Sequence, residues 1–119
     1  MPAQIIETND TPFKKVDIDP ALFETVIDGM ENTVLNGTAY QARIPDVAFC
    51  GKTGTSQNPS GEDHSVFFGF APKENPSVAV AVYIENAGSG GAVAAPIASL
   101  VVEKYLKGEV TRPQLEERM

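Results

Sequence analysis

Apolar residues recur at steps of three and four between Pro20 and Leu35, the spacing that places side chains along one side of a helix. They are Leu22, Phe23, Val26, Ile27, Met30 and Val34. Asp19 precedes the proline, and this pair is typical of a helix start because the carboxylate caps free N–H groups. Asn36 and Gly37 offer a left-handed residue to end the helix. The pattern predicts an amphipathic helix over residues 20–35.

Three further segments have the composition of strands. They span about residues 47–56, 65–71 and 77–84, and turn-forming sequences at 58–63 and 72–76 separate them. Short turns place consecutive strands side by side, so the segments predict an antiparallel meander. A short β-like run at residues 4–8 would extend the sheet to four strands.

The third strand is apolar on both faces, with valines on one face and Ala79, Ala81 and Tyr83 on the other. Such a strand is expected to be covered on both sides. The small alanine face would let a helix approach closely, and residues 94–107 predict that helix, with Gly108 just past its end. This helix is apolar over most of its surface and is predicted to be buried.

The predicted fold class is α+β: an antiparallel sheet of three to four strands with a long C-terminal helix packed on it. Two helices leave much of one sheet face uncovered, so a further layer of structure is expected to be missing from this chain. The tail from residue 109 to 119 predicts another turn or two of helix, with Thr111 as its cap and Pro113 early in it.

Composition and charge exclude several function classes. A chain of 119 residues forms at most one domain, and 42% hydrophobic with 21% charged residues is typical of a globular protein. The net charge of −7 argues against nucleic-acid and anionic membrane surfaces, which need clustered cations. The single cysteine, Cys50, excludes an internal disulfide. The longest apolar run, residues 78–84, is too short to span a bilayer, and neither a metal nor a cofactor is expected.

The richest chemistry lies in residues 49–57, FCGKTGTSQ, which combine a lysine with several hydroxyls and glycines. Residues 51–53, GKT, look like the end of a phosphate-binding loop. That loop needs a glycine where Asp46 stands, and Gly54 and Pro59 prevent the helix that should follow. Another alternative is a polar strand end without function, in which glycines mark bulges and threonines reflect β propensity.

Lys-Thr-Gly on a strand is also the third element of serine acyl-transferases that react with penicillin, beside a Ser-x-x-Lys and a Ser-x-Asn type motif. Further motifs follow along the chain in a fixed order: Gly37-Thr38-Ala39, Cys50 to Gln57, Asp63-His64-Ser65, Phe68 to Pro72, Glu85-Asn86, Gly90-Gly91 and Ala95 to Ala98. In this order the chain resembles the C-terminal part of a class B, monofunctional penicillin-binding protein of the cell-elongation type. The resemblance implies a partial penicillin-binding transpeptidase or serine β-lactamase-like fold that lacks its helical subdomain.

The resemblance assigns roles to residues 52–55. Lys52 would supply fixed positive charge and help move or stabilise the proton on the serine of the second motif. The hydroxyls of Thr53 and Thr55 would bind the terminal carboxylate of a peptide ending in D-Ala-D-Ala, and Gly54 would allow its close approach. The backbone N–H of Thr55 would be one of two oxyanion-hole donors. A strict pleat places Lys52 on the face opposite the threonines, so its long reach or strand twist must bring it to the same cleft.

The chain carries no nucleophile of the expected type. None of its serines has a lysine three residues on: Ser56, Ser60, Ser65, Ser77, Ser89 and Ser99. His64 and Ser65 are adjacent on a strand and would point to opposite faces, so His64 is expected only to start the strand or lie in a loop. In the family, the serine and its lysine lie upstream on a helical subdomain. Residues 1–119 are therefore expected to be a C-terminal fragment that forms no acyl-enzyme alone.

The resemblance implies a serine-type peptidoglycan D,D-transpeptidase as the parent protein, anchored in the inner membrane with this domain in the periplasm. Its partners would be stem peptides, β-lactams and the missing N-terminal half; the anchor itself would be absent here. Three alternatives stay open. One is a β-lactam-sensing receptor or non-catalytic binding module of the same fold, another is a stand-alone interaction domain, and the third is a carboxypeptidase or β-lactamase that shares the triplet.

Overall fold

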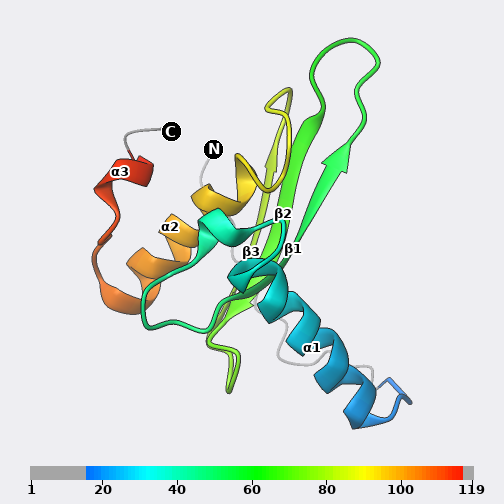
Figure 1. Ribbon diagram of the computed structural model, residues 1–119, viewed down its shortest axis with the longest axis vertical. Coiled ribbons are helices and arrows are strands. Elements are labelled where there is room, and N and C mark those ends of the chain that lie inside the picture. Colours follow the sequence, from blue (N-terminus) through cyan, green and yellow to red (C-terminus); the bar gives the residue numbers. More distant parts are fainter. Residues whose placement is uncertain (1–15, 117–119) are drawn as a thin grey trace, which may run out of the picture.

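The predicted strands form one antiparallel sheet in the computed structural model, which describes residues 16–116 of the chain. The order of elements is α1 (Pro20–Leu35), a short 3-10 helix (Tyr40–Ala42), β1 (Cys50–Ser56), β2 (His64–Ala71), β3 (Val78–Ile84), α2 (Ala94–Lys107) and α3 (Pro113–Glu116) (Figure 1). The sheet order is β1-β2-β3, so the predicted meander and the α+β class are confirmed. The β-like run at residues 4–8 lies outside the described residues.

Helix α1 begins as predicted but ends differently. The Asp19 carboxylate accepts a hydrogen bond from the Ala21 N–H at 3.0 Å, which caps the first turn. At the other end, the prediction of a left-handed residue is wrong, because Asn36 has φ −136° and Gly37 is not among the residues with positive φ. Gly37 is needed for a different reason: a Cβ there would lie 2.9 Å from the Thr33 Cα, so only glycine lets the chain turn back so closely.

Strand β1 starts at Cys50 and not at residue 47 as predicted. Ile44 and Val47 form an isolated bridge, and Asp46 between them has φ 63°. This tight turn redirects the chain just before the sheet, so residues 47–49 do not pair with β2. Phe49 is nevertheless buried, and its ring packs against Phe67 of β2 with centroids 5.6 Å apart.

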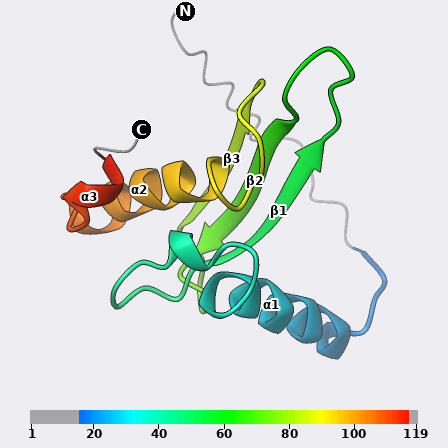
Figure 2. The same ribbon diagram turned by 45° about the horizontal axis from the view of Figure 1, so that its top comes forward.

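The core lies between α2 and one face of the sheet. Phe67 of β2 is fully buried there, and Ala94, Ala98 and Val102 of α2 are equally inaccessible. On β3, Val78, Val80 and Val82 pack against this core, while Ala79, Ala81 and Tyr83 are exposed. The prediction that α2 approaches the alanine face is therefore wrong. The alanines that are buried, Ala94, Ala95 and Ala98, belong to α2 itself, and their small size allows the helix to pack against the valine face. Figure 2 shows α2 beside the sheet.

The second sheet face is largely open within the described residues. Helix α1 lies across the start of β1, but its apolar side chains Leu22, Phe23 and Val26 remain 58%, 45% and 61% exposed. An apolar hollow of about 480 Å³ lies between Met30 of α1 and the strand residues Phe68, Gly69, Phe70, Ala79, Val80 and Ala81. Within the described residues β3 is therefore covered on one face only, and the predicted burial of α2 holds for one side of the helix, since Val101 and Tyr105 are exposed.

The tail folds back onto α2 through buried charges. Thr111 does not cap α3 as predicted; its N–H and hydroxyl donate hydrogen bonds to the Glu103 carboxylate at 3.1 and 2.6 Å. Glu103 is fully buried and forms an ion pair with Arg112 at 3.3 Å. Arg112 also donates a hydrogen bond to the Arg43 carbonyl oxygen at 2.8 Å, which joins the tail to the loop before β1.

Candidate active site

Strand β1 carries residues 52–55 along a free edge of the sheet. It pairs with β2 alone, so one side of its backbone has no strand partner among the described residues. The strand begins buried at Cys50 and Gly51 and ends exposed at Thr55 and Ser56. An edge of this kind can pair with an extended peptide. Because Lys52 lies inside a strand and no helix starts at it, the phosphate-binding-loop alternative is excluded.

Lys52 and the threonines occupy opposite faces of β1. Lys52 lies opposite Phe68, which is 51% exposed on the open face, whereas Thr53 lies opposite the fully buried Phe67. Side chains alternate along a strand, so Thr55 shares the α2 face with Thr53. The Lys52 Nζ nevertheless donates a hydrogen bond to the Thr53 carbonyl oxygen at 3.0 Å. The long side chain thus bends over the edge and brings its charge to the threonines.

The backbone groups at this edge have the direction that substrate docking needs. The Thr53 carbonyl oxygen accepts a side-chain hydrogen bond from Lys52. In a strand, the N–H and C=O groups of alternate residues point to the same side. The N–H of Thr55 therefore points to the same edge as the Thr53 carbonyl, away from β2. The role of the Thr55 N–H as an oxyanion donor stays a prediction, but this N–H points to the free edge, where a bound peptide would lie.

Thr38 belongs to the Gly37-Thr38-Ala39 motif, from which no role for it could be predicted. In the structure its hydroxyl lies 2.9 Å from the Thr53 hydroxyl, so the two form a hydrogen bond across fifteen residues of sequence. Thr38 follows α1 and precedes the 3-10 helix, and it is exposed. Since a hydroxyl both donates and accepts, Thr53 can accept from Thr38 and still donate to a ligand.

The structure also separates the side chains of His64 and Ser65, the adjacent histidine and serine of this chain. His64 is the first residue of β2, as expected, and its Nδ1 accepts a hydrogen bond from the Asn86 N–H at 3.0 Å. Its ring lies 5.5 Å from the Tyr83 ring on the open face. Ser65 points to the α2 face and is fully buried. The two side chains therefore cannot act together.

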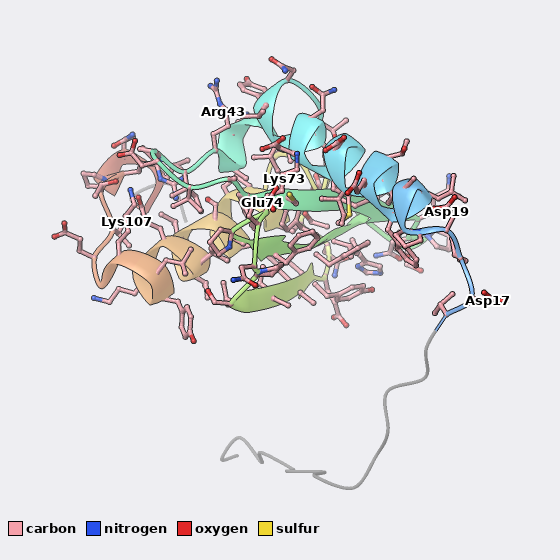
Figure 3. The ribbon with its side chains drawn as sticks, turned by 90° about the horizontal axis from the view of Figure 1, so that it is seen from below. Asp17, Asp19, Arg43, Lys73, Glu74 and Lys107 are labelled. Atoms are coloured by element: carbon pink, nitrogen blue, oxygen red, sulfur yellow. The ribbon has the colours of Figure 1, made fainter. Side chains whose placement is uncertain are left out.

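Charged residues fix α1 beside the start of β1. The Lys73 Nζ lies 2.7 Å from an oxygen of Asp28 and 3.0 Å from one of Glu31. Figure 3 shows Lys73 close to α1. Its hydrogen bonds to Asp28 and then to Glu31 raise the pKa of the Lys73 ammonium above its usual value. Nearby, burial, followed by the charge of Glu31, raises the pKa of the Cys50 thiol. Cys50 therefore stays protonated at neutral pH and is a poor nucleophile.

The free-edged strand, its lysine and its paired threonine hydroxyls carry the kinds of group that docking of an extended, carboxylate-bearing ligand would need. Comparison with known proteins identifies the family. Residues 1–103 match the family model "Penicillin binding protein transpeptidase domain", and the chain belongs to this family. The resemblance predicted from the motifs is confirmed.

Among curated relatives, peptidoglycan D,D-transpeptidase MrdA of Haemophilus influenzae is 34% identical over 95% of this chain and 20% of its own length. Peptidoglycan D,D-transpeptidase PbpA of Mycobacterium tuberculosis is 41% identical over 56% of the chain and 15% of its own length. The chain thus spans a fifth or less of these two relatives.

Solved structures show the same fold. Pseudomonas aeruginosa PBP2 in complex with WCK 5153 superposes with a TM-score of 0.72 at 35% identity, covering 90% of this chain and 25% of that one. The ceftriaxone acyl-enzyme complex of M. tuberculosis penicillin-binding protein A gives a TM-score of 0.66 at 32% identity, covering 75% and 22%. Within residues 16–116, no helix has the length and apolar character needed to cross a membrane.

Proposed function

We propose that this chain provides the substrate-docking side of a serine-type peptidoglycan D,D-transpeptidase, which crosslinks stem peptides through an acyl-serine intermediate and is acylated by β-lactams. The observation that carries the proposal is the free edge of β1, where the Lys52 ammonium donates a hydrogen bond to the Thr53 carbonyl oxygen and the Thr53 hydroxyl is paired with that of Thr38. The names of the relatives, peptidoglycan D,D-transpeptidases and a β-lactam acyl-enzyme, support it.

In the proposed mechanism, a stem peptide ending in D-Ala-D-Ala extends along the edge of β1. The hydroxyls of Thr53 and Thr55 bind its terminal carboxylate, and Gly54 allows its backbone close approach. The positive charge of Lys52 attracts the same carboxylate, and its ammonium helps to move the proton on the serine of the second motif. As the serine oxygen bonds to the scissile carbonyl carbon, the carbonyl oxygen becomes an oxyanion that the Thr55 N–H stabilises. Its collapse breaks the amide bond, and the terminal D-Ala leaves with the serine proton on its amine. Losing one oxyanion donor typically costs about 2.7–4 kcal/mol in the transition state.

The nucleophile comes from outside this chain in the proposal. The open face beside Lys52, Phe68 and Ala81 is where the remainder of the transpeptidase domain packs, and it brings the Ser-x-x-Lys and Ser-x-Asn motifs to the edge of β1. Peptidoglycan lies outside the cytoplasmic membrane, so the site faces the periplasm. The parent protein holds it there through an anchor elsewhere in its sequence.

Fluorescent penicillin tests the proposal in two steps. The purified 119-residue chain is expected to remain unlabelled, because it lacks the serine that would be acylated. Covalent labelling of this chain would refute the assignment of the nucleophile. The full-length protein containing the chain is expected to be labelled and to crosslink a pentapeptide ending in D-Ala-D-Ala. Labelling without any crosslinked product would instead favour a β-lactam-binding receptor.

Lys52→Ala in the full-length protein tests the docking edge itself. Removing this charge is expected to slow labelling by roughly 10²–10³-fold, as for other preorganised transition-state contacts. Lys104→Ala is the matched control. Lys104 is exposed on α2, so this substitution removes the same charge without affecting β1. Equal labelling of both variants would show that Lys52 has no part in the site.

A further inference from the structure

Ser65 of β2 lies directly opposite Thr55 in the register of the sheet. Opposite residues of an antiparallel pair point to the same face, with Cβ atoms about 4.5–5.5 Å apart. The two environments differ sharply, because Thr55 is exposed whereas Ser65 has no exposed surface. A buried hydroxyl therefore lies next to the residue whose N–H is the proposed oxyanion donor.

The Ser65 hydroxyl holds the segment that leads from β3 into α2. Its Oγ accepts a hydrogen bond from the Ala94 N–H at 2.9 Å and donates one to the Ser89 carbonyl oxygen at 2.9 Å. The Ala94 N–H belongs to the first turn of α2, where no helix carbonyl can bind it. The hydroxyl thus acts as both donor and acceptor, and its two hydrogen bonds fix the conformation of residues 89–94.

The segment that Ser65 holds lies directly against the docking strand. A Cβ at Gly90 would lie 2.5 Å from the Gly54 carbonyl oxygen and 3.1 Å from the Gly54 nitrogen, so only glycine fits there. Gly91 lies as tightly against the carbonyl oxygen of Thr38, the residue whose hydroxyl binds Thr53. Residues 90 and 91 therefore support both the backbone and the hydroxyl pair of the site.

We propose that Ser65 is a positioning residue: its hydroxyl holds residues 89–94 against β1 and thereby sets the direction in which Thr55 N–H and the Thr53 hydroxyl face the substrate. The chemical consequence rests on the proposed function. Ser65 touches no substrate and acts through Gly90 and Gly91. Without its hydroxyl, Ser89 and Ala94 lose their shared partner, and the glycines can move away from Gly54.

Ser65→Ala in the full-length protein tests this, with β-lactam labelling resolved into a binding constant and an acylation rate constant. The acylation rate is expected to fall roughly tenfold, less than the 10²–10³-fold cost of losing an oxyanion donor outright. Ser65→Thr keeps the hydroxyl and is expected to restore most of the rate. If the alanine variant does not fold, Ser65→Cys keeps a weak donor and acceptor and is expected to give an intermediate rate.

Ser99→Ala is the matched control. Ser99 is also fully buried, and its hydroxyl donates to the Pro96 carbonyl at 2.7 Å and accepts from Arg112 at 3.1 Å. Ser99→Ala removes one donated and one accepted hydrogen bond, as Ser65→Ala does, but at a site distant from β1. The acylation rate is therefore expected to stay at the wild-type value. Equal acylation rates for Ser65→Ala and Ser99→Ala would overturn the positioning role.

A second measurement separates this inference from the proposed function. In NMR spectra of the 119-residue chain, Ser65→Ala is expected to shift the amide signals of Gly54 and Thr55 and to speed their hydrogen exchange, whereas Ser99→Ala leaves them unchanged. Unshifted signals in both variants would contradict the coupling between Ser65 and the strand. Absence of labelling in the wild-type full-length protein would refute the proposed function, while the NMR comparison would still decide the coupling.

Discussion

Replacing Arg112 by methionine would remove the cation that faces the buried carboxylate of Glu103. The Arg112 side chain donates to the same Glu103 oxygen from Nε and Nη2, both at 3.3 Å. It also donates to the Ser99 hydroxyl and carbonyl and to the Arg43 carbonyl. Methionine preserves much of the apolar volume, so the change mainly tests the charge and its hydrogen bonds.

The magnitude follows from what remains around Glu103. Removing one partner of a buried ion pair typically costs about 3–5 kcal/mol. Here the carboxylate keeps two hydrogen bonds from Thr111 at 3.1 and 2.6 Å, and the Lys107 ammonium lies 3.9 Å away. These groups compensate part of the lost interaction. We therefore expect Arg112→Met to lower the free energy of unfolding by about 2–4 kcal/mol.

Urea unfolding of the 119-residue chain, followed by circular dichroism, measures this change as a lower midpoint with an unchanged slope. Arg43→Met is the control, because Arg43 is exposed and makes one hydrogen bond to the Tyr40 carbonyl and a cation–π contact with its ring. It is expected to cost less than about 1 kcal/mol.

A loss below about 1 kcal/mol for Arg112→Met would refute the reasoning, because it would mean that the carboxylate regains water when its partner leaves. The double variant Arg112→Met with Glu103→Leu gives an independent check. Since it removes both charges together, it is expected to be more stable than Arg112→Met alone. A double variant that is less stable than the single one would contradict the buried-charge explanation.

Three further predictions concern stability. Burial acts to raise the pKa of Glu103, but the hydrogen bonds from Thr111 and the charge of Arg112 outweigh it and lower the pKa below the unfolded value of 4.5. The ionised carboxylate therefore stabilises the fold fully above pH 4.5, and this stabilisation is lost as the pH falls through the lower folded pKa. Glu103→Gln should make the urea midpoint less dependent on pH in that acid range. In thermal unfolding, Gly29→Ala should stabilise the folded chain by about 0.5–1 kcal/mol, because the added Cβ lies on a helix and meets open space. Gly90→Ala should destabilise the folded chain, because the added Cβ would clash with backbone atoms. Lys73→Met should speed hydrogen exchange within α1 and leave β3 protected, with Lys104→Met as the unchanged control.

Local features of the sequence determined the elements of this protein. The helix periodicity and the Asp19 cap predicted α1, and the prediction of residues 94–107 matches α2 to the residue. Gly108 ends α2 in the left-handed conformation, as its position indicates. These predictions succeed because capping, periodicity and turn formation depend on residues within one or two turns of each other. The motif order identified the family for a similar reason, since it is read directly along the chain.

The sequence placed the chemistry of Lys52, Thr53 and Thr55 on one strand, but only the tertiary structure decided how they meet. The pleat predicts opposite faces, and the fold adds that Lys52 bends over a free edge to the Thr53 carbonyl. Whether a strand has a free edge depends on which strands pair, and no single strand carries that information. The hydrogen bond between Thr38 and Thr53 also depends on the path of the chain between them.

Packing likewise decided which apolar face is buried. Strand β3 is apolar on both faces, so its pattern could not choose between Val80 and Ala81; the small residues of α2 select the valine face because they allow close approach. Glu103 and Ser65 look like ordinary polar positions in the sequence, yet both are fully buried because distant segments supply their hydrogen-bond partners. Periodicity shows which side chains share a face, whereas the partner of that face is fixed only when distant segments pack together.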